Sequence, residues 1–322
     1  MNNIAAAQVG EGDLAGSRKM FQESLAIGRE IGADTAVATA LVNLGDVGLQ
    51  LGDPAGSRKA YEEALAIFQK TAEKGKTSYP LVGLGDVFSA TGDLSAAKSS
   101  YEQALAVSRE SGEKHQSAVA LSGLGTVQMR QGDLAGARKG YEEALALHPE
   151  LDEKDAAADD QLLLARLEME EERPEEAEAT LRGLVPAPKS PDREALARAM
   201  LAELLAAQGK LSEAQQQISP AAALARKTQR LAVRLDVQIA AARVRMAPGH
   251  PGDLHNATTA LNGVLAEAKK IGLADPQLQA RLILGIIEKK SGKGVAQLEE
   301  LEKDATARGF GLIARKAAKA RD

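Results

Sequence analysis

The sequence predicts an all-α protein built from stacked, antiparallel helix pairs. The segment GDPAGSRKAYEEALAI at residues 52–67 recurs as GDLAGSRKMFQESLAI from Gly12, GDLSAAKSSYEQALAV from Gly92 and GDLAGARKGYEEALAL from Gly132, so copies start every forty residues. Hydrophobic residues make up 44% of the chain, whereas Trp is absent and Phe and Tyr number four each. Such a composition favours helices with small side chains at their contacts. Because repeat arrays grow by adding units, the period sets the architecture more than the length does.

Each unit of forty residues is expected to contain two helices. Residues 35–53 place apolar side chains at steps of three and four, the spacing of one helical face: Val37, Leu41, Leu44 and Val47. Gly52 suits a left-handed C-terminal cap, and Asp53 can accept hydrogen bonds from the first amides of the next helix. The second helix is therefore expected over 54–73.

One aromatic residue stands at the same position in each of the first four units: Phe21, Tyr61, Tyr101 and Tyr141. This regularity predicts a packing wedge rather than a platform on which bases stack. Gly45, Gly85 and Gly125 lie inside the first helices, where each glycine costs about 1 kcal/mol relative to alanine. We expect close approach of neighbouring helices to compensate for this cost.

These residues carry a family resemblance. Leu44-Gly45, the turn at Gly52-Asp53 and the Ser57-x3-Tyr61 pair resemble the tetratricopeptide repeat, whose pattern includes a Leu-Gly and an Ala-x3-Phe. The resemblance implies a right-handed α-solenoid whose first helices line a concave groove. The units here are longer than the common form by six residues, a variant similar to that of bacterial signalling scaffolds in this family.

The repeats divide the chain into a regular region at 1–150 and a divergent region at 151–322 that ends in a capping helix. The divergent units are expected at 162–184, at 192–229, at about 230–272, and from Pro276 onward. Proline-rich loops are expected at 186–191 and 247–253, because proline cannot continue a helix. Pro220 falls inside a predicted second helix, so a kink or break is expected near Ser219.

The first unit is expected to be incomplete. Asn3-Ile4 aligns with Asn43-Leu44, so Met1 falls in the middle of a first helix. This alignment suggests that the chain is a fragment of a longer protein whose upstream segment completes that helix. The alternative is a short natural start with a frayed first repeat.

The resemblance also implies which residues line the groove. In the second to fourth units they are Asn43, Asp46, Gln50, Tyr79, Val82, Asp86, Ser122, Thr126, Met129 and Arg130. Members of the family that dock chaperones clamp a carboxylate with lysine, asparagine and arginine, which Val82, Ser122 and Gly123 do not supply. Asp46 and Asp86 occupy the same repeat position, which favours a partner with basic side chains or, alternatively, serves contacts between repeats.

Catalytic, metal and cofactor sites are not expected. The chain has no cysteine and four histidines, of which only His250 and His255 cluster, with Asp253 between them. That segment is interpreted as a turn with an insertion rather than a metal site. The glycine-rich stretches at 10–16 and 291–294 lack the spacing of nucleotide-binding loops.

Charge is distributed unevenly along the chain. Residues 1–150 carry a net charge of −5, residues 151–192 of −8 and residues 193–322 of +8. The acidic run at 168–178 is interpreted as a solvated turn between helices. Arg226, Arg230 and Arg234 recur at four-residue steps, but aromatic side chains for base stacking are lacking there, so specific nucleic-acid binding is not expected.

Two functions are consistent with the sequence. The favoured one is a noncatalytic scaffold or sensor that binds a protein or peptide partner in its groove. The alternative is the regulatory C-terminal region of a larger bacterial protein, such as a serine/threonine kinase or a DNA-binding regulator. With neither a secretion signal nor a long apolar run, the chain is expected to be cytoplasmic and to bind no membrane.

Overall fold

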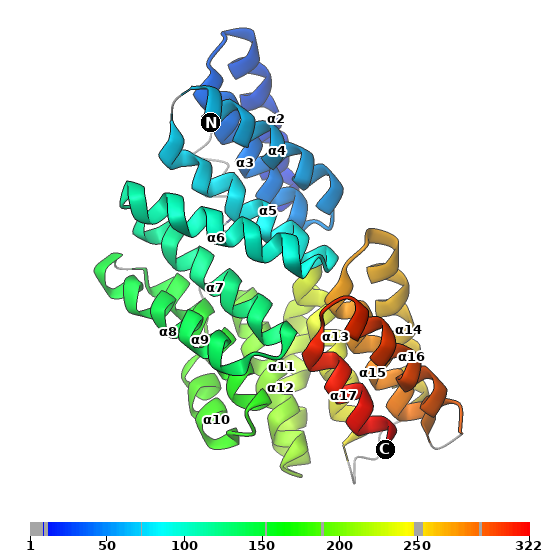
Figure 1. Cartoon of the computed structure of the whole chain (residues 1–322). Helices are drawn as coiled ribbons and strands as arrows, with labels where there is room; N and C mark the ends of the chain where they lie inside the picture. Colours follow the sequence, from blue (N-terminus) through cyan, green and yellow to red (C-terminus); the bar gives the residue numbers. More distant parts are fainter. Residues whose placement is uncertain are drawn as a thin grey trace. The chain divides into compact units, whose positions relative to one another are not determined.

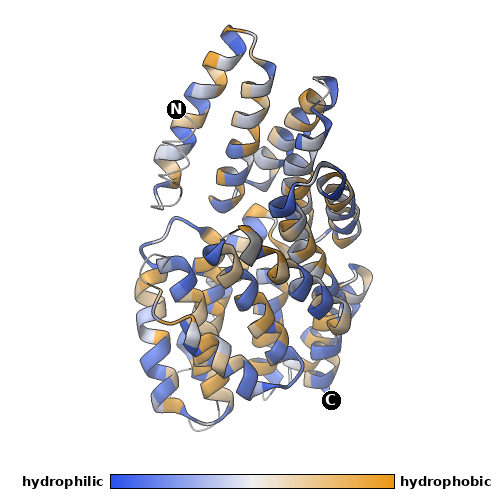
Figure 2. Ribbon diagram, turned by 90° about the vertical axis from the view of Figure 1, so that its left-hand side faces the viewer, coloured by the Kyte–Doolittle hydropathy of each residue, from blue (hydrophilic) through white to orange (hydrophobic). Residues whose placement is uncertain are grey.

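The computed structural model describes residue 9 and residues 12–71, 73–151, 153–187, 190–247, 254–289 and 292–322 (Figure 1). Within these ranges all regular secondary structure is helical, and there is no strand (Figure 2). The helices of the regular units are α2 (Leu14–Glu30), α3 (Asp34–Gln50), α4 (Pro54–Lys70), the short 3₁₀ helix η1 (Lys74–Thr77), α5 (Ser78–Thr91), α6 (Leu94–Ser111), α7 (Lys114–Gln131) and α8 (Leu134–Leu151).

The divergent region continues the same alternation of first and second helices. Its helices are α9 (Lys154–Glu170), α10 (Pro174–Gly183), α11 (Pro191–Ala207), α12 (Leu211–Ala225), α13 (Leu231–Met246), α14 (Leu254–Ile271), α15 (Ala274–Lys289), α16 (Gly294–Ala307) and α17 (Gly311–Arg321). Successive helices pack on each other, as α3 does on α4, α5 on α6 and α11 on α12. The predicted all-α solenoid of helix pairs is confirmed, and the loss of sequence regularity after residue 150 does not end it.

The chain forms two compact units, which are described separately below. Unit 1 consists of Met1–Leu124, Glu143–Asp152 and Gln229–Leu231, and unit 2 of Gly125–Glu142, Glu153–Thr228 and Ala232–Asp322. Each unit has its own buried core. Apolar side chains of α3, α4 and α5 form one in unit 1, and the largest core of unit 2 is built from α9, α10, α11, α12 and α13.

The recurring Gly-Asp pair ends one helix and begins the next. Gly52 has a φ of 87°, in the left-handed region where a side chain is unfavourable. The Asp53 carboxylate accepts a hydrogen bond from the Gly56 amide at 2.9 Å, and Asp13, Asp93 and Asp133 cap their helices in the same way. The predicted caps are therefore present in all four regular units, which explains why this dipeptide recurs.

The aromatic residue of each regular unit is buried, as predicted for a packing wedge. Phe21, Tyr61, Tyr101 and Tyr141 are at most 2% exposed. The Tyr61 ring lies so close to Gly45 and Gly83 that a Cβ on either glycine would approach it to 2.5 or 2.3 Å. A ring thus occupies the space that a side chain on the glycine would need, and this contact accounts for glycine within the first helices.

One alternative expected for the divergent region, a break near Ser219, is absent. Helix α12 runs from Leu211 to Ala225 through Pro220, so the helix is not interrupted there. Burial of Ile218, Ala221 and Ala225 holds the turns on both sides of the proline in place. Arg226 and Arg230 lie in the connection between α12 and α13, whereas Arg234 lies on α13, so the three arginines do not share one helix.

Other expectations fall on segments of which the structure describes only part. Residues 184–187 are non-helical, whereas Pro191 is the first residue of α11. His250 and Asp253, with most of the predicted loop at 247–253, lie outside the described residues. The same holds for Asn3 and Ile4, on which the expectation of an incomplete first unit depends.

Candidate functional site

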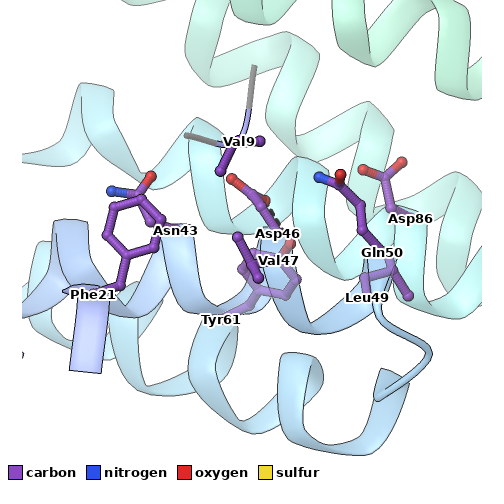
Figure 3. Close-up of a pocket in the computed structure, with 9 residues that line it drawn as sticks. All are labelled: Val9, Phe21, Asn43, Asp46, Val47, Leu49, Gln50, Tyr61 and Asp86. Carbon is purple, nitrogen blue, oxygen red and sulfur yellow. Dashed lines mark hydrogen bonds between the residues drawn. The ribbon is translucent and has the colours of Figure 1, made fainter. Parts of the chain in front are cut away.

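A cavity of about 330 Å³ with both apolar and polar lining residues lies in unit 1. Its lining residues come chiefly from α2, α3, α4 and α5: Val9, Phe21, Asn43, Asp46, Val47, Leu49, Gln50, Tyr61 and Asp86. Figure 3 shows that the polar ends of Asn43, Asp46, Gln50 and Asp86 point to the same side. Two carboxylates and two side-chain amides therefore face the same cavity, which is also lined by the apolar residues Phe21, Val47 and Leu49.

The buried tyrosines hold the two carboxylates in place. Tyr61 donates a hydrogen bond from its hydroxyl to Asp46 at 2.6 Å, and Tyr101 donates one to Asp86 at 2.5 Å. Surrounding protein raises the pKa of Asp46, and the hydrogen bond from Tyr61 lowers it in part, although the side chain still reaches solvent. Asp46 and Asp86 thus each accept a hydrogen bond from the tyrosine of their own repeat, and both also line the cavity.

The ten residues expected to line the groove separate into three groups. Asn43, Asp46, Gln50 and Asp86 lie together in the cavity of unit 1. Thr126, Met129 and Arg130 line a smaller cavity in unit 2. Tyr79, Val82 and Ser122 line neither of these cavities, and Val82 is buried.

The cavity of unit 2 contains charged residues that the sequence reading missed. It measures about 180 Å³ and is lined by Thr126, Met129, Arg130, Leu163, Arg166, Glu170, Asp236, Asp275, Gln279, Leu312, Ile313 and Lys316. A signal for one of them was present, because Arg166 follows Asp46, Asp86 and Thr126 at the same spacing of forty. Asp236 and Asp275 have no counterpart in the regular units, so no repeat pattern could have identified them.

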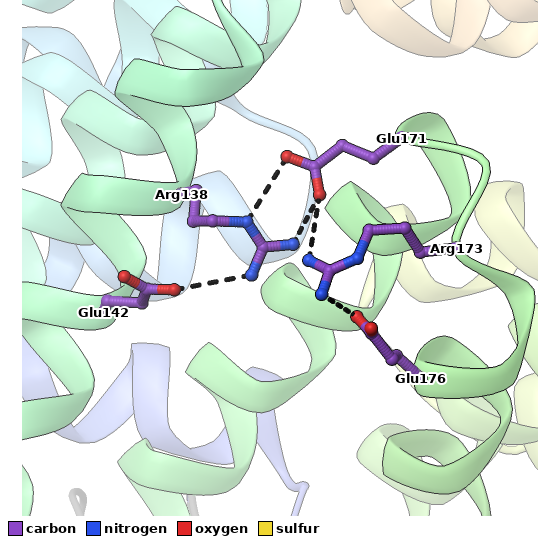
Figure 4. A network of polar contacts seen from close by, with 5 residues as sticks. All are labelled: Arg138, Glu142, Glu171, Arg173 and Glu176. Carbon is purple, nitrogen blue, oxygen red and sulfur yellow. Dashed lines mark hydrogen bonds and ion pairs between the residues drawn. The ribbon is translucent and has the colours of Figure 1, made fainter.

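Several carboxylates of the acidic run at 168–178 form ion pairs within unit 2. Glu171, at the turn between α9 and α10, accepts hydrogen bonds from Arg138 and forms an ion pair with Arg173 (Figure 4). Arg173 also pairs with Glu176, and Arg138 with Glu142. Only residues 171–173 of the run lie between the two helices, and within the described part of the chain the buried Glu168 Oε2 has no hydrogen-bond partner, so only part of the run is the solvated turn that was expected.

The described residues contain no group of three potential ligands that could hold a metal ion. None of the helices in the described part of the chain combines the length and the apolar character needed to cross a membrane.

The successive packed helix pairs define a helical-repeat protein of the α-solenoid class. The chain belongs to the tetratricopeptide-repeat family: the model of the MalT-like TPR region matches residues 77–309, and that of the tetratricopeptide repeat matches residues 1–70 and 36–110. No curated protein matches the chain in sequence.

Solved structures with the same fold include proteins crystallised with peptides. The Rap conjugation gene regulator of the plasmid pLS20, in complex with a peptide, aligns with a TM-score of 0.67 at 14% identity over 91% of this chain and 79% of that one. NprR in complex with its cognate peptide NprX aligns with a TM-score of 0.60 at 15% identity over 90% and 88% of the two chains. At these identities the likeness establishes the fold alone.

Proposed function

We propose that this chain is a noncatalytic scaffold or sensor that acts in the cytoplasm and binds a peptide or partner segment with basic side chains. The observation that carries the proposal is the convergence of Asp46 and Asp86 on the cavity of unit 1. Two carboxylates one repeat apart suit a Lys or Arg side chain, which donates charge-assisted hydrogen bonds. The similarity to Rap and NprR, whose structures contain peptides, supports a ligand of this kind.

The amides of the cavity suit the backbone of such a segment. Asn43 and Gln50 stand on α3 on either side of Asp46 and project the same way (Figure 3). Among the described residues the Gln50 Oε1 atom is enclosed and has no hydrogen-bond partner. Because an unsatisfied buried oxygen costs about 1–3 kcal/mol, a backbone amide that donates to it adds to the affinity.

The proposal is tested with fluorescein-labelled peptides in which the sequence is fixed and one position is Lys, Arg, Gln or Glu. Binding to the full chain is measured by fluorescence anisotropy. We expect the Lys and Arg peptides to bind more tightly than the Gln and Glu peptides. Asp46→Asn and Asp86→Asn should remove this preference, since each keeps an oxygen that accepts from its tyrosine but loses the negative charge.

Glu62→Gln is the matched control, because Glu62 lies on the second helix α4 in an exposed ion pair with Arg58. This variant should retain the wild-type preference. As the pH falls, protonation of Asp46, whose pKa is raised, should weaken binding of the basic peptides. Equal binding of all four peptides by the wild type, or an unchanged preference in both aspartate variants, would contradict the proposal.

The alternative function, the regulatory C-terminal region of a larger protein, is supported by a different observation. One solved structure of the same fold is described as a conjugation gene regulator and another, from B. thuringiensis, as a quorum sensor. The coding sequence upstream of Met1 tests the alternative. An in-frame kinase or DNA-binding domain would support it, and an in-frame stop codon directly before Met1 would exclude it.

A further inference from the structure

We propose that the smaller cavity of unit 2 is a second ligand site, which binds a small zwitterion bearing both a carboxylate and an ammonium group. Arg166 on α9 would receive the carboxylate, and Asp236 on α13 would receive the ammonium. The site is distinct from the cavity of unit 1 and does not depend on the function proposed above.

Most of the charges around this cavity already have partners. Lys316 lies 2.6 Å from Glu170, and Arg243 lies 2.7 Å from Glu203 and also hydrogen-bonds to Gln279. Arg130 is 4.0 Å from Asp275, which itself accepts from Gln279 at 2.8 Å. Each of these cations therefore has a carboxylate beside it, and each of these carboxylates has a cation.

Arg166 and Asp236 are the exceptions. Within the part of the chain that the structure describes, neither side chain makes an ion pair within 4.0 Å or a hydrogen bond to a side chain, although both line the cavity. One is a cation and the other an anion. Both side chains are half-buried, and a partly desolvated charge without a direct partner is unfavourable, so a ligand that supplies the opposite charge to each would bind favourably.

The surroundings keep both groups ready for such a ligand. Burial alone would lower the pKa of Arg166, but the carboxylates of Asp236, Glu203, Asp275 and Glu170 raise it, so the guanidinium remains charged. Burial raises the pKa of Asp236 to about 6, against the lowering effect of Arg166. At neutral pH the aspartate is still mostly ionised, and a cationic group beside it would stabilise that state.

The size of the cavity limits the ligand to a small molecule. Its volume of about 180 Å³ corresponds to about six waters at liquid density. The C-terminal helix α17 contributes Leu312, Ile313 and Lys316 to its wall, so an apolar patch lies beside the two charges. A free α-amino acid combines a carboxylate, an ammonium group and a short side chain, and a dipeptide offers the same charges at a greater separation.

The test uses the purified full chain and titrates free L-amino acids and dipeptides one at a time by isothermal titration calorimetry. We expect at least one of them to bind. Its N-acetyl derivative, which lacks the ammonium, and its amide, which lacks the carboxylate, should each bind at least about tenfold more weakly, equivalent to ~1.4 kcal/mol. Binding by a dipeptide alone would identify peptide ends rather than free amino acids as the source.

Two variants assign the charges. Arg166→Gln should bind the parent ligand at least about tenfold more weakly than the wild type does, but its affinity for the amide, which lacks the carboxylate, should change little. Asp236→Asn should also bind the parent ligand more weakly, but its affinity for the N-acetyl derivative, which lacks the ammonium, should change little. Binding of the parent should also weaken as the pH falls below about 6, where Asp236, faced by Arg166, Arg130, Glu203 and Asp275, becomes protonated.

The control variants are Arg182→Gln and Asp155→Asn, since both side chains belong to unit 2, are exposed and do not line the cavity. Both should bind the parent ligand as the wild type does. The proposal is overturned if no amino acid or dipeptide binds, or if acetylation and amidation leave the affinity unchanged. These ligand-side results decide the question even if Arg166→Gln does not fold.

Discussion

At the residue scale, one contact explains both the aromatic residue and the glycines of the regular units. The Tyr101 ring packs against Gly85 of its own first helix and Gly123 of the next, where an added Cβ would approach it to 2.5 and 2.4 Å. Tyr61 makes the same pair of contacts with Gly45 and Gly83. Each ring therefore joins two successive helix pairs, and the cost of glycine in a helix is offset by burial of the ring.

Replacing one of these glycines should destabilise the protein even though alanine is the better helix former. A Cβ in Gly83→Ala would lie 2.3 Å from the Tyr61 ring, so we expect a loss of roughly 1–3 kcal/mol by overpacking. Gly263→Ala is the matched control, because Gly263 lies within α14 with no atom within 4 Å of the new Cβ, and it should stabilise by about 1 kcal/mol. Urea unfolding followed by circular dichroism measures the free energy of unfolding of both variants. If this free energy changed in the same direction in both, the explanation would be refuted.

The hydrogen bonds of the buried tyrosine hydroxyls should contribute different amounts to the free energy of unfolding, according to the acceptor of each bond. Tyr61 donates to the carboxylate of Asp46, whereas Tyr141 shares a 3.1 Å hydrogen bond with the hydroxyl of Thr126. Since bonds to charged groups are stronger, Tyr61→Phe should cost about 1.5–3 kcal/mol and Tyr141→Phe about 0.5–1.5 kcal/mol. Tyr61→Phe should also raise the pKa of Asp46 further, because that bond lowers it. A carboxyl titration by NMR in which the Asp46 pKa falls or stays constant would show that the bond is not formed.

At the element scale, the turn between the two helices of a unit depends on one left-handed residue. Gly12, Gly52, Gly92 and Gly132 occupy this position with φ between 87° and 91°. The fifth unit has Glu172 there, with a φ of 58°, and it is the only described non-glycine residue with positive φ. The geometry of the turn is thus retained where the preferred residue is lost.

Restoring glycine at this turn should stabilise the protein. The left-handed conformation costs a residue with a side chain about 1–2 kcal/mol, and part of this gain is offset by the larger entropy of glycine in the unfolded chain. The ion pair of Glu172 with Lys319 contributes little, because it is 3.7 Å long and both side chains are exposed. We therefore expect Glu172→Gly to stabilise by about 0.5–1 kcal/mol, measured by thermal unfolding. Gly132→Ala should have the opposite effect, and a loss of stability in Glu172→Gly would contradict this account.

At the scale of the whole molecule, the forty-residue period predicted the fold but only part of the candidate sites. Each regular unit repeats the same contacts, so the family resemblance together with the register assigned Asn43, Asp46, Gln50 and Asp86 to one surface. The placement of Arg166 and Asp236 in one cavity could not be predicted in this way, since the two residues come from α9 and α13 and no repeat position relates them. Pro220 is a second feature that the local sequence did not predict. Burial of one helix face keeps α12 continuous at a proline that by itself favours the end of a helix. The division into regular residues 1–150 and divergent residues 151–322 remains a proposal about sequence regularity.

The contact of α17 with the beginning of unit 2 is a further long-range feature that no local pattern encodes. Arg315 donates to the carbonyl of Gly132 at 2.8 Å, although 183 residues separate the two in the chain. Phe310, directly before α17, is fully buried, and Leu312 packs against the cluster around Met129 and Tyr141. The last helix therefore stabilises unit 2 by joining its two ends.

Gly311 is the residue that allows this close approach. A Cβ at this position would lie 2.3 Å from the backbone carbonyl oxygen of Gln131, which cannot move as a flexible side chain can. Gly311→Ala should therefore separate the start of α17 from the end of α7 and destabilise unit 2 by roughly 1–3 kcal/mol.

Hydrogen exchange of Gly311→Ala should show lost protection in α17 and near Gly132 before any change in α3 and α4. Leu312, Ile313 and Lys316 line the smaller cavity. The same variant should therefore weaken the binding of a ligand to this cavity and leave peptide binding by unit 1 unchanged. Unchanged protection of α17 in Gly311→Ala would show that this contact does not hold the helix in place.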